Sequence, residues 1–267
     1  MSMLPHHVSY GSGGTTVFLL HGVGGSHQSW DATLPVLAGA GYKVVAWDAP
    51  GYGQSVATGP LSMQVFAQMA LGLIASVGTE RNVIVGHSMG GMIAQEAMAL
   101  NAALRGPSVG VHGLVLFATS AAFGKPGGDW QKQFLQSRFA ALDAGLGMEG
   151  LAKVLVGGML ALSTPDSVRD RAMQTMVQVS EQTYRQALAA IVSFNRLHHL
   201  PSIAVPTLCL ACHQDKTAPP DMMEKMASLI PGGRYECIAQ AGHLGNLEQP
   251  EAFHAALLKF LRQHFPT

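Results

Sequence analysis

The sequence is poor in charged residues and has no excess of either sign. Lys and Arg together number 16, Asp and Glu also number 16, and the formal net charge of the 267 residues is zero. Proteins that hold a nucleic-acid backbone neutralise its phosphates with clustered Lys and Arg. We therefore expect no nucleic-acid partner for this chain.

The chain has no long hydrophobic run, and we also expect no leader segment. Residues 1–7 contain neither a basic flank nor an apolar stretch, so they are not typical of a signal peptide. Apolar runs such as residues 114–118 are far shorter than the roughly 20 residues that cross a bilayer. We expect a cytoplasmic protein that does not associate with membranes.

Cysteine is scarce, and its odd count of three argues against a disulfide framework. Cys209 and Cys212 form a C-x-x-C pair, which in a redox protein stands at the start of a helix. Here the pair lies in an apolar, strand-like run, and no second C-x-x-C completes a zinc site. We expect buried structural thiols, and neither a metal nor an organic cofactor.

Short apolar runs alternate with segments of helical period. This alternation is typical of an α/β fold with a mostly parallel sheet that helices cover on both faces. Ser62 is placed to cap one helix, and the last helix is expected to start at Pro250. The expected strands are residues 16–20, 43–47, 82–85, 113–118, 206–211 and 234–238, with a further short strand near residues 7–10.

The alternation stops after Ser120. Residues 123–200 show helical patterns and no convincing strand, and Thr164-Pro165-Asp166 is typical of a helix N-terminus. The strand pattern resumes at Pro206. We therefore expect a core formed by residues 1–122 and 201–267, with a helical cap of residues 123–200 inserted into it.

The strongest chemical signal is Gly86-His87-Ser88-Met89-Gly90-Gly91. It follows a predicted strand and precedes a helical run, which is the context of the G-x-S-x-G nucleophile turn. A nucleophile on so tight a turn has strained backbone angles, and the residues two positions away must lack side chains. A chance glycine-rich turn is the alternative, but the strand–turn–helix context favours Ser88 as a nucleophile.

A serine hydroxyl needs a base to take its proton, and that base needs an orienting acid. His243 follows the last predicted strand, in a loop at the carboxyl edge of the sheet where such folds bind ligands. The loop after the preceding strand offers Asp215 as its only carboxylate before Asp221. The chain order of Ser, acid and His fits the same fold, so we predict a triad of Ser88, His243 and Asp215.

The oxyanion of the transition state needs hydrogen-bond donors. The N–H of Met89, directly after the nucleophile, is one candidate, and the N–H of Val23 in the glycine-rich loop after residues 16–20 is the second. That loop lacks the spacing of a phosphate-binding loop. Asp48 begins a further glycine-rich turn and is expected to brace it by hydrogen bonds, whereas His6 is expected to be solvated.

Together these motifs resemble the α/β-hydrolase superfamily over essentially the whole chain, and the helical insertion resembles the cap of many members. Ser88-Met89-Gly90-Gly91 and the segment 241–251 are most similar to small carboxylesterases and to 3-oxoadipate enol-lactonases of bacterial aromatic catabolism. The resemblance implies a serine hydrolase that cleaves a small ester or lactone through an acyl-enzyme.

Two alternatives stay open. Meta-cleavage-product hydrolases cleave a C–C bond with the same triad, but usually have an aromatic residue after the His and an Asn before the Ser, where this chain has Leu244 and His87. A non-catalytic small-molecule receptor on the same fold is the other alternative, because fold alone does not determine function.

We expect the cap to select the substrate. Its inward surface is predicted to be apolar, and an arginine could grip a substrate carboxylate with two hydrogen bonds. The predicted substrate-binding residues are Trp130, Arg138, Arg196 and Leu244, with Arg185 as a further candidate for the carboxylate. The predicted apolar residues of the cap are Trp130, Phe134, Phe139, Met159, Met173 and Met176. A homodimer is neither favoured nor excluded by the sequence.

Overall fold

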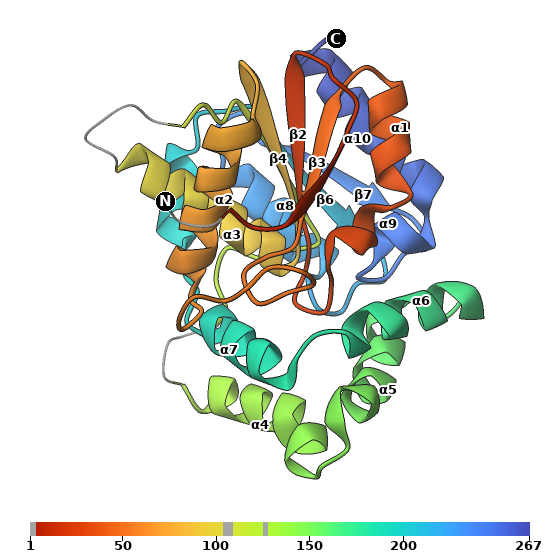
Figure 1. Cartoon of the computed structure of the whole chain (residues 1–267). Coiled ribbons are helices and arrows are strands. Elements are labelled where there is room, and N and C mark those ends of the chain that lie inside the picture. The colour runs from red at the N-terminus through yellow and green to blue at the C-terminus, as the bar shows by residue number, and fades with distance from the viewer. Residues whose placement is uncertain (1–3, 104–108, 125–127) are drawn as a thin grey trace.

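The structure, a computed structural model, describes residues 4–103, 109–124 and 128–267. A seven-stranded sheet forms its centre, with the strand order β1-β3-β2-β4-β5-β6-β7 (Figure 1). Strand β1 pairs antiparallel to β3, and the other neighbours pair in parallel. The strands are β1 (His7–Tyr10), β2 (Thr15–Leu20), β3 (Lys43–Trp47), β4 (Arg81–His87), β5 (Gly113–Phe117), β6 (Thr207–Cys212) and β7 (Arg234–Ile238). All seven predicted strands are therefore present.

Helices cover both faces of the sheet, which explains why its central strands are continuously apolar. Every residue of β2, β5 and β6 is buried, as expected for parallel strands packed on two sides. One face carries α2 (Met63–Val77), α3 (Met89–Ala102) and α8 (Pro220–Ser228), and the other carries α1 (Thr33–Gly39) and α10 (Pro250–His264). The predicted fold class is thus confirmed.

Local signals set the ends of two of these helices. The Ser62 hydroxyl accepts a hydrogen bond from the Val65 N–H at the start of α2, which satisfies a backbone donor that has no partner within the helix. Pro250 opens α10, where its missing N–H costs nothing. The same helix buries Phe253, Leu257, Phe260 and Leu261 against the sheet.

A helical region is inserted between β5 and β6. It contains α4 (Asp129–Asp143), α5 (Gly147–Met159), α6 (Asp166–Val177), α7 (Glu181–Val192) and the 3-10 helix η2 (Leu197–Ser202). Figure 1 shows α4–α7 as a separate layer below the sheet and its covering helices. We propose that residues 123–200 form the cap and that residues 1–122 and 201–267 form the core.

The two chain segments that enter and leave this region are joined to each other. Ala122 and Asn195 form an isolated antiparallel bridge. The Phe123 N–H donates to the Phe194 carbonyl at 2.9 Å, and the Arg196 N–H donates to the Ala121 carbonyl at 2.7 Å. The insertion therefore has a hydrogen-bonded neck.

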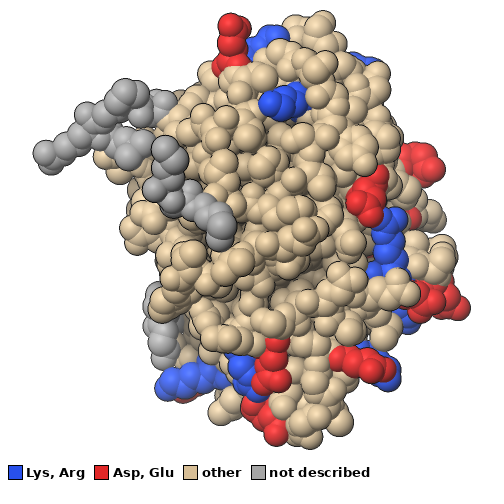
Figure 2. Space-filling view, in the orientation of Figure 1, with Lys and Arg blue, Asp and Glu red and all other residues tan. Residues whose placement is uncertain are grey.

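The surface and the thiols agree with the composition. On the face shown in Figure 2, basic and acidic side chains are interspersed and form no patch of one sign. Cys209 and Cys212 are buried in β6, and burial raises the pKa of Cys209 to about 12, so the prediction of buried structural thiols is confirmed. In the described part of the chain, no helix combines the length and apolarity needed to span a membrane.

Candidate active site

Ser88 lies on a sharp turn between β4 and α3, as the sequence predicts. Its backbone has φ 51° and ψ −116°, a conformation that costs a non-glycine residue about 1–3 kcal/mol. A Cβ atom at Gly90 would lie 2.2 Å from the Leu20 carbonyl oxygen, and one at Gly86 would lie 2.4 Å from the Gly90 carbonyl oxygen. Glycine is required at both positions, because β2, β4 and α3 meet there without room for side chains.

His243 and Asp215 meet Ser88 in a hydrogen-bonded chain. His243 Nε2 is 2.9 Å from Ser88 Oγ, and His243 Nδ1 is 2.7 Å from Asp215 Oδ2. The three residues follow β4, β7 and β6, so the parallel sheet places them at one edge. An ionised carboxylate only accepts hydrogen bonds. Nδ1 therefore carries the proton and Nε2 is free to accept the Ser88 hydroxyl proton.

Asp215 is held in its charged form although its side chain is buried. Burial by itself would raise the pKa of Asp215, but attraction to His243 and hydrogen bonds outweigh it and keep the pKa below the ordinary value of 3.8. Oδ1 accepts the N–H groups of Thr217 at 2.7 Å and Ala218 at 3.0 Å. The carboxylate can thus stabilise a positive charge on His243 at neutral pH.

Two buried imidazoles, those of His87 and His21, form hydrogen bonds with the backbone around the site. The Nε2–H of His87 donates to the His243 carbonyl at 2.8 Å, and burial lowers the pKa of His87 to about 3. His21 donates from Nδ1 to the Gly22 carbonyl at 2.8 Å and accepts the Ala49 N–H at Nε2. Burial lowers the pKa of His21 to about 4, so both rings are neutral at pH 7. The packing of His87 beneath the serine was predicted, whereas the role of His21 in holding the Gly22–Val23 segment was not.

Ser88 and His243 face a two-part cavity between the sheet and the inserted helices. The larger part has a volume of about 410 Å³ and is lined by Val23 and Met89, the two predicted oxyanion residues, together with apolar side chains. The smaller part, of about 60 Å³, is lined by Leu244, Asn246 and Leu247 on the His243 side. No acceptor in the described ranges takes a hydrogen bond from the N–H of Val23 or Met89.

The cavity contains most of the predicted substrate-binding residues. Trp130 and Arg138 line the larger part and Leu244 the smaller part, while Met159 and Met176 line both. Phe134 also lines the larger part. Phe139 and Met173 pack against the core instead. Tyr184 is not among the predicted substrate-binding residues, but it is 1% exposed and also lines the larger part.

The three candidate arginines have different surroundings. Arg196 does not line the active-site cavity: its guanidinium donates to Glu96 Oε1 at 2.6 Å, so its predicted contact with substrate is corrected to a structural ion pair. Arg185 pairs with Asp143 and Glu181. Arg138 lies over the Phe134 ring, with Cζ 5.0 Å from the centroid, and has no ion-pair partner within the described parts of the chain.

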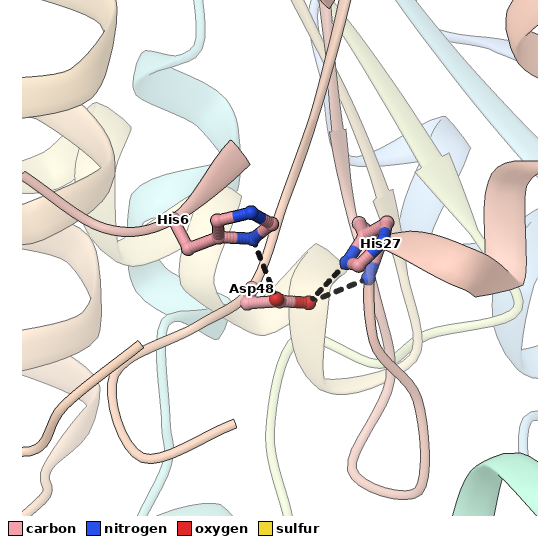
Figure 3. A group of neighbouring side chains, drawn as sticks. All are labelled: His6, His27 and Asp48. Atoms are coloured by element: carbon pink, nitrogen blue, oxygen red, sulfur yellow. Dashed lines mark hydrogen bonds and ion pairs between the residues drawn. The ribbon is translucent and has the colours of Figure 1, made fainter. Parts of the chain in front are cut away.

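His6, His27 and Asp48 form the group drawn in Figure 3. His6 Nδ1 donates to Asp48 Oδ2 and His27 Nδ1 donates to Asp48 Oδ1, both at 2.8 Å. The same oxygens also accept the N–H groups of His27 and Gln54. With four donors the carboxylate has no free lone pair for a metal ion, so the group is a hydrogen-bonded brace. Asp48 has its predicted structural role, but His6 is bound to it and is not merely solvated.

Sequence similarity to known proteins agrees with the geometry of the site. Residues 17–256 match the alpha/beta hydrolase family. The BpoC protein of Mycobacterium tuberculosis, provisionally named a non-heme bromoperoxidase, is 31% identical over 259 residues, which cover 94% of each protein. The chain belongs to the alpha/beta hydrolase family, as its motifs predict.

Individual similar proteins have different activities in their names. A 2-hydroxy-6-oxononadienedioate/2-hydroxy-6-oxononatrienedioate hydrolase of Paraburkholderia phymatum is 29% identical over 97% of this chain and 91% of its own. A thermophilic esterase from Thermogutta terrifontis has a TM-score of 0.84 at 26% identity, covering 97% of this chain and 93% of that one. The enol-lactonase from Burkholderia xenovorans LB400 has a TM-score of 0.82 at 23% identity, covering 96% and 95%; the last likeness is one of fold.

Proposed function

We propose that this protein is a serine hydrolase that cleaves a carboxylic ester or lactone through an acyl-enzyme. The observation that carries the proposal is the hydrogen-bonded chain from Ser88 through His243 to Asp215, on a strained turn that opens into a cavity. The esterase from Thermogutta terrifontis, similar along almost its whole length, supports the same reaction class.

The mechanism follows from the position of each atom. Ser88 Oγ attacks the carbonyl carbon while His243 Nε2 takes the hydroxyl proton, and the electron pair of the C=O π bond moves to the carbonyl oxygen, which becomes an oxyanion. The N–H groups of Met89 and Val23 bind this oxyanion, and each of them stabilises the transition state by roughly 3 kcal/mol. When the oxyanion collapses, His243 returns the proton to the leaving oxygen. Water that His243 deprotonates then attacks the acyl-enzyme, the bond between the acyl carbon and Ser88 Oγ breaks, and His243 returns the proton to Oγ as the acid is released.

The cavity suggests the kind of acyl group. Its larger part is mostly apolar, with Phe123, Phe134 and Leu188 in the lining, but it also contains the Arg138 guanidinium and the buried Tyr184 side chain. A guanidinium without a carboxylate partner can bind a substrate carboxylate with charge-assisted hydrogen bonds. The proposed substrate therefore has an apolar body and a carboxylate, as an enol-lactone of aromatic catabolism has, and the inserted helices act as the selecting cap.

The test compares kcat/KM for 3-oxoadipate enol-lactone and for a neutral short-chain p-nitrophenyl ester, with Ser88→Ala as the control. We expect a preference for the lactone of about 100-fold or more, equivalent to roughly 3 kcal/mol in transition-state binding, and no turnover of either substrate by Ser88→Ala. Equal values would indicate a general carboxylesterase. Turnover by Ser88→Ala at the wild-type rate would refute the assignment of the nucleophile.

A second candidate function is hydrolysis of a C–C bond in a meta-cleavage product. The similarity to the Paraburkholderia phymatum hydrolase favours it, whereas Leu244 and His87 at the two positions beside the triad residues do not. Incubation with a coloured ring-fission product separates the candidates, since only a C–C hydrolase bleaches it. Turnover of any of these substrates argues against a non-catalytic receptor.

A further inference from the structure

Glu248 is a buried carboxylate that neither the triad nor the cavity explains. It ends the short helix α9 (Gly245–Glu248), which follows His243, and its side chain is 8% exposed. It has no ion-pair partner in the described portion of the chain, yet four residues donate hydrogen bonds to it. A buried charge is costly unless hydrogen bonds replace its lost water. Glu248 therefore depends on these donors remaining in place.

One set of donors comes from the two residues beside His243. The Gly242 N–H lies 3.1 Å from both carboxylate oxygens, and the Leu244 N–H donates to Oε1 at 3.0 Å. The carboxylate thus holds the backbone immediately before and after the imidazole that contacts Ser88.

The other set of donors comes from the segment between α5 and α6. Glu248 Oε2 accepts the Ala161 N–H at 2.7 Å and the Thr164 hydroxyl at 2.6 Å. Thr164 was predicted to mark the N-terminus of a helix, and α6 does begin at Asp166, but with no side-chain cap. The Thr164 side chain points to Glu248 instead. A single carboxylate therefore joins the inserted helices to the His243 loop.

The same two segments also touch directly. The His243 N–H donates to the Met159 carbonyl at 2.6 Å, and a Cβ atom at Gly242 would lie 2.4 Å from that oxygen. The Met159 side chain lines both parts of the cavity. Residues 159–164 and 242–244 thus form one hydrogen-bonded unit, one side of which contacts the substrate cavity.

We infer that Glu248 is a positioning residue for His243, and that it makes the position of the imidazole depend on the α5–α6 segment. The inference rests on the proposed serine-hydrolase function. Loss of the carboxylate would leave the Gly242, Leu244 and Ala161 N–H groups without their shared acceptor. His243 would then sample positions from which it no longer reaches Ser88 Oγ in the productive geometry, while the cavity itself is retained.

The experiment measures how fast a fluorophosphonate modifies Ser88, because this reaction needs the activated serine but no knowledge of the substrate. Glu248→Gln keeps the shape of the side chain but replaces one acceptor oxygen with an NH₂ group. Because both oxygens accept backbone N–H groups, the new donor must face another donor in either orientation of the amide. Thr164→Val removes only the hydroxyl donor of the inserted region. Glu251→Gln makes the same chemical change at an exposed glutamate near the start of α10 and is the matched control.

We expect Glu248→Gln to lower the second-order rate of modification by roughly 10- to 100-fold, the upper value being the loss that a displacement of about 1 Å produces. The final extent of labelling, read by mass spectrometry, should stay complete. Thr164→Val should react at least about threefold more slowly than wild type, and Glu251→Gln at the wild-type rate. A purely structural role would instead reduce the fraction of protein that can be labelled and leave the rate of the remainder unchanged.

Three results would overturn the inference in different ways. A wild-type rate in Glu248→Gln excludes the positioning role. If Glu248→Gln does not fold, a wild-type rate in Thr164→Val excludes the link to the inserted helices. A wild-type protein that the fluorophosphonate does not label at Ser88 refutes the proposed function itself, and the inference fails with it.

Discussion

Replacing Gly90 with alanine tests whether the nucleophile turn depends on contact between α3 and β2. The new Cβ would lie 2.2 Å from the Leu20 carbonyl oxygen and 2.9 Å from that of His21, whereas ordinary contacts begin at 3.4 Å. Helix α3 must therefore move away from β2 by about 1 Å. Helix α3 begins with Met89, directly after Ser88, and β2 leads into the Val23 segment. The substitution thus separates the nucleophile from one side of the proposed oxyanion site.

The expected magnitudes follow from this displacement. Overpacking of this kind costs about 1–3 kcal/mol of unfolding free energy, which lowers the melting temperature by roughly 2–10 °C in a chain of this size. A misplacement of about 1 Å lowers kcat/KM roughly 100-fold. Both effects should appear together, because one movement of α3 causes them.

Thermal unfolding followed by circular dichroism, and ester hydrolysis by the same samples, provide the two readouts. Gly72→Ala is the matched control, since a Cβ atom there would meet nothing within 4 Å and Gly72 lies in the exposed face of α2. It should raise stability by about 0.5–1 kcal/mol and leave activity unchanged. A Gly90→Ala protein that melts and hydrolyses like wild type would show that the turn tolerates a side chain, and the steric argument would be wrong.

Two further predictions concern charged groups of the site. Because the pKa of Asp215 lies below its ordinary value of 3.8 in the folded protein, its ionised form contributes stability that is fully present above that value and is lost as the pH falls through the folded-state pKa. The difference in unfolding free energy between wild type and Asp215→Asn, measured with urea, should therefore be largest near pH 7 and shrink toward pH 2; a difference independent of pH would contradict this. Arg138→Met should lower kcat/KM for a carboxylate-bearing ester by about 10- to 100-fold, the loss expected for a hydrogen bond to a charged group, and change that for its neutral methyl ester less than threefold. Arg185→Met, which removes an arginine already paired with Asp143 and Glu181, is the control, and an equal loss for both esters would argue against a carboxylate site.

The sequence predicts this fold well because its main signals are local. The buried strands, the Ser62 cap and the glycines around Ser88 can each be predicted from residues that are close neighbours in the sequence. The order of the triad also follows, since the carboxyl ends of parallel strands share one edge of the sheet.

What the sequence could not show depends on partners far along the chain. The Arg196–Glu96 pair spans 100 residues and the Thr164–Glu248 hydrogen bond spans 84. The residues next to Arg196 in the sequence therefore do not reveal that it is already paired, and those next to Thr164 do not reveal that its hydroxyl binds Glu248 instead of capping a helix. Tyr184 fits the apolar face of a helix equally well whether that face meets the core or a cavity. Only the packing of the inserted helices on the sheet distinguishes these cases.

The hydrogen-bonded neck at Ala122 and Asn195 has a consequence for evolution. The bridge brings both ends of the insertion together at the surface of the core. The positions of β5 and β6 therefore do not depend on how many residues lie between the two ends. The entropic cost of a longer closed segment grows only slowly with its length. Provided that the α5–α6 segment bonded to Glu248 and His243 is kept, the other inserted helices can change in length between relatives while Ser88, Asp215 and His243 keep their places, which would let one reaction serve many substrates.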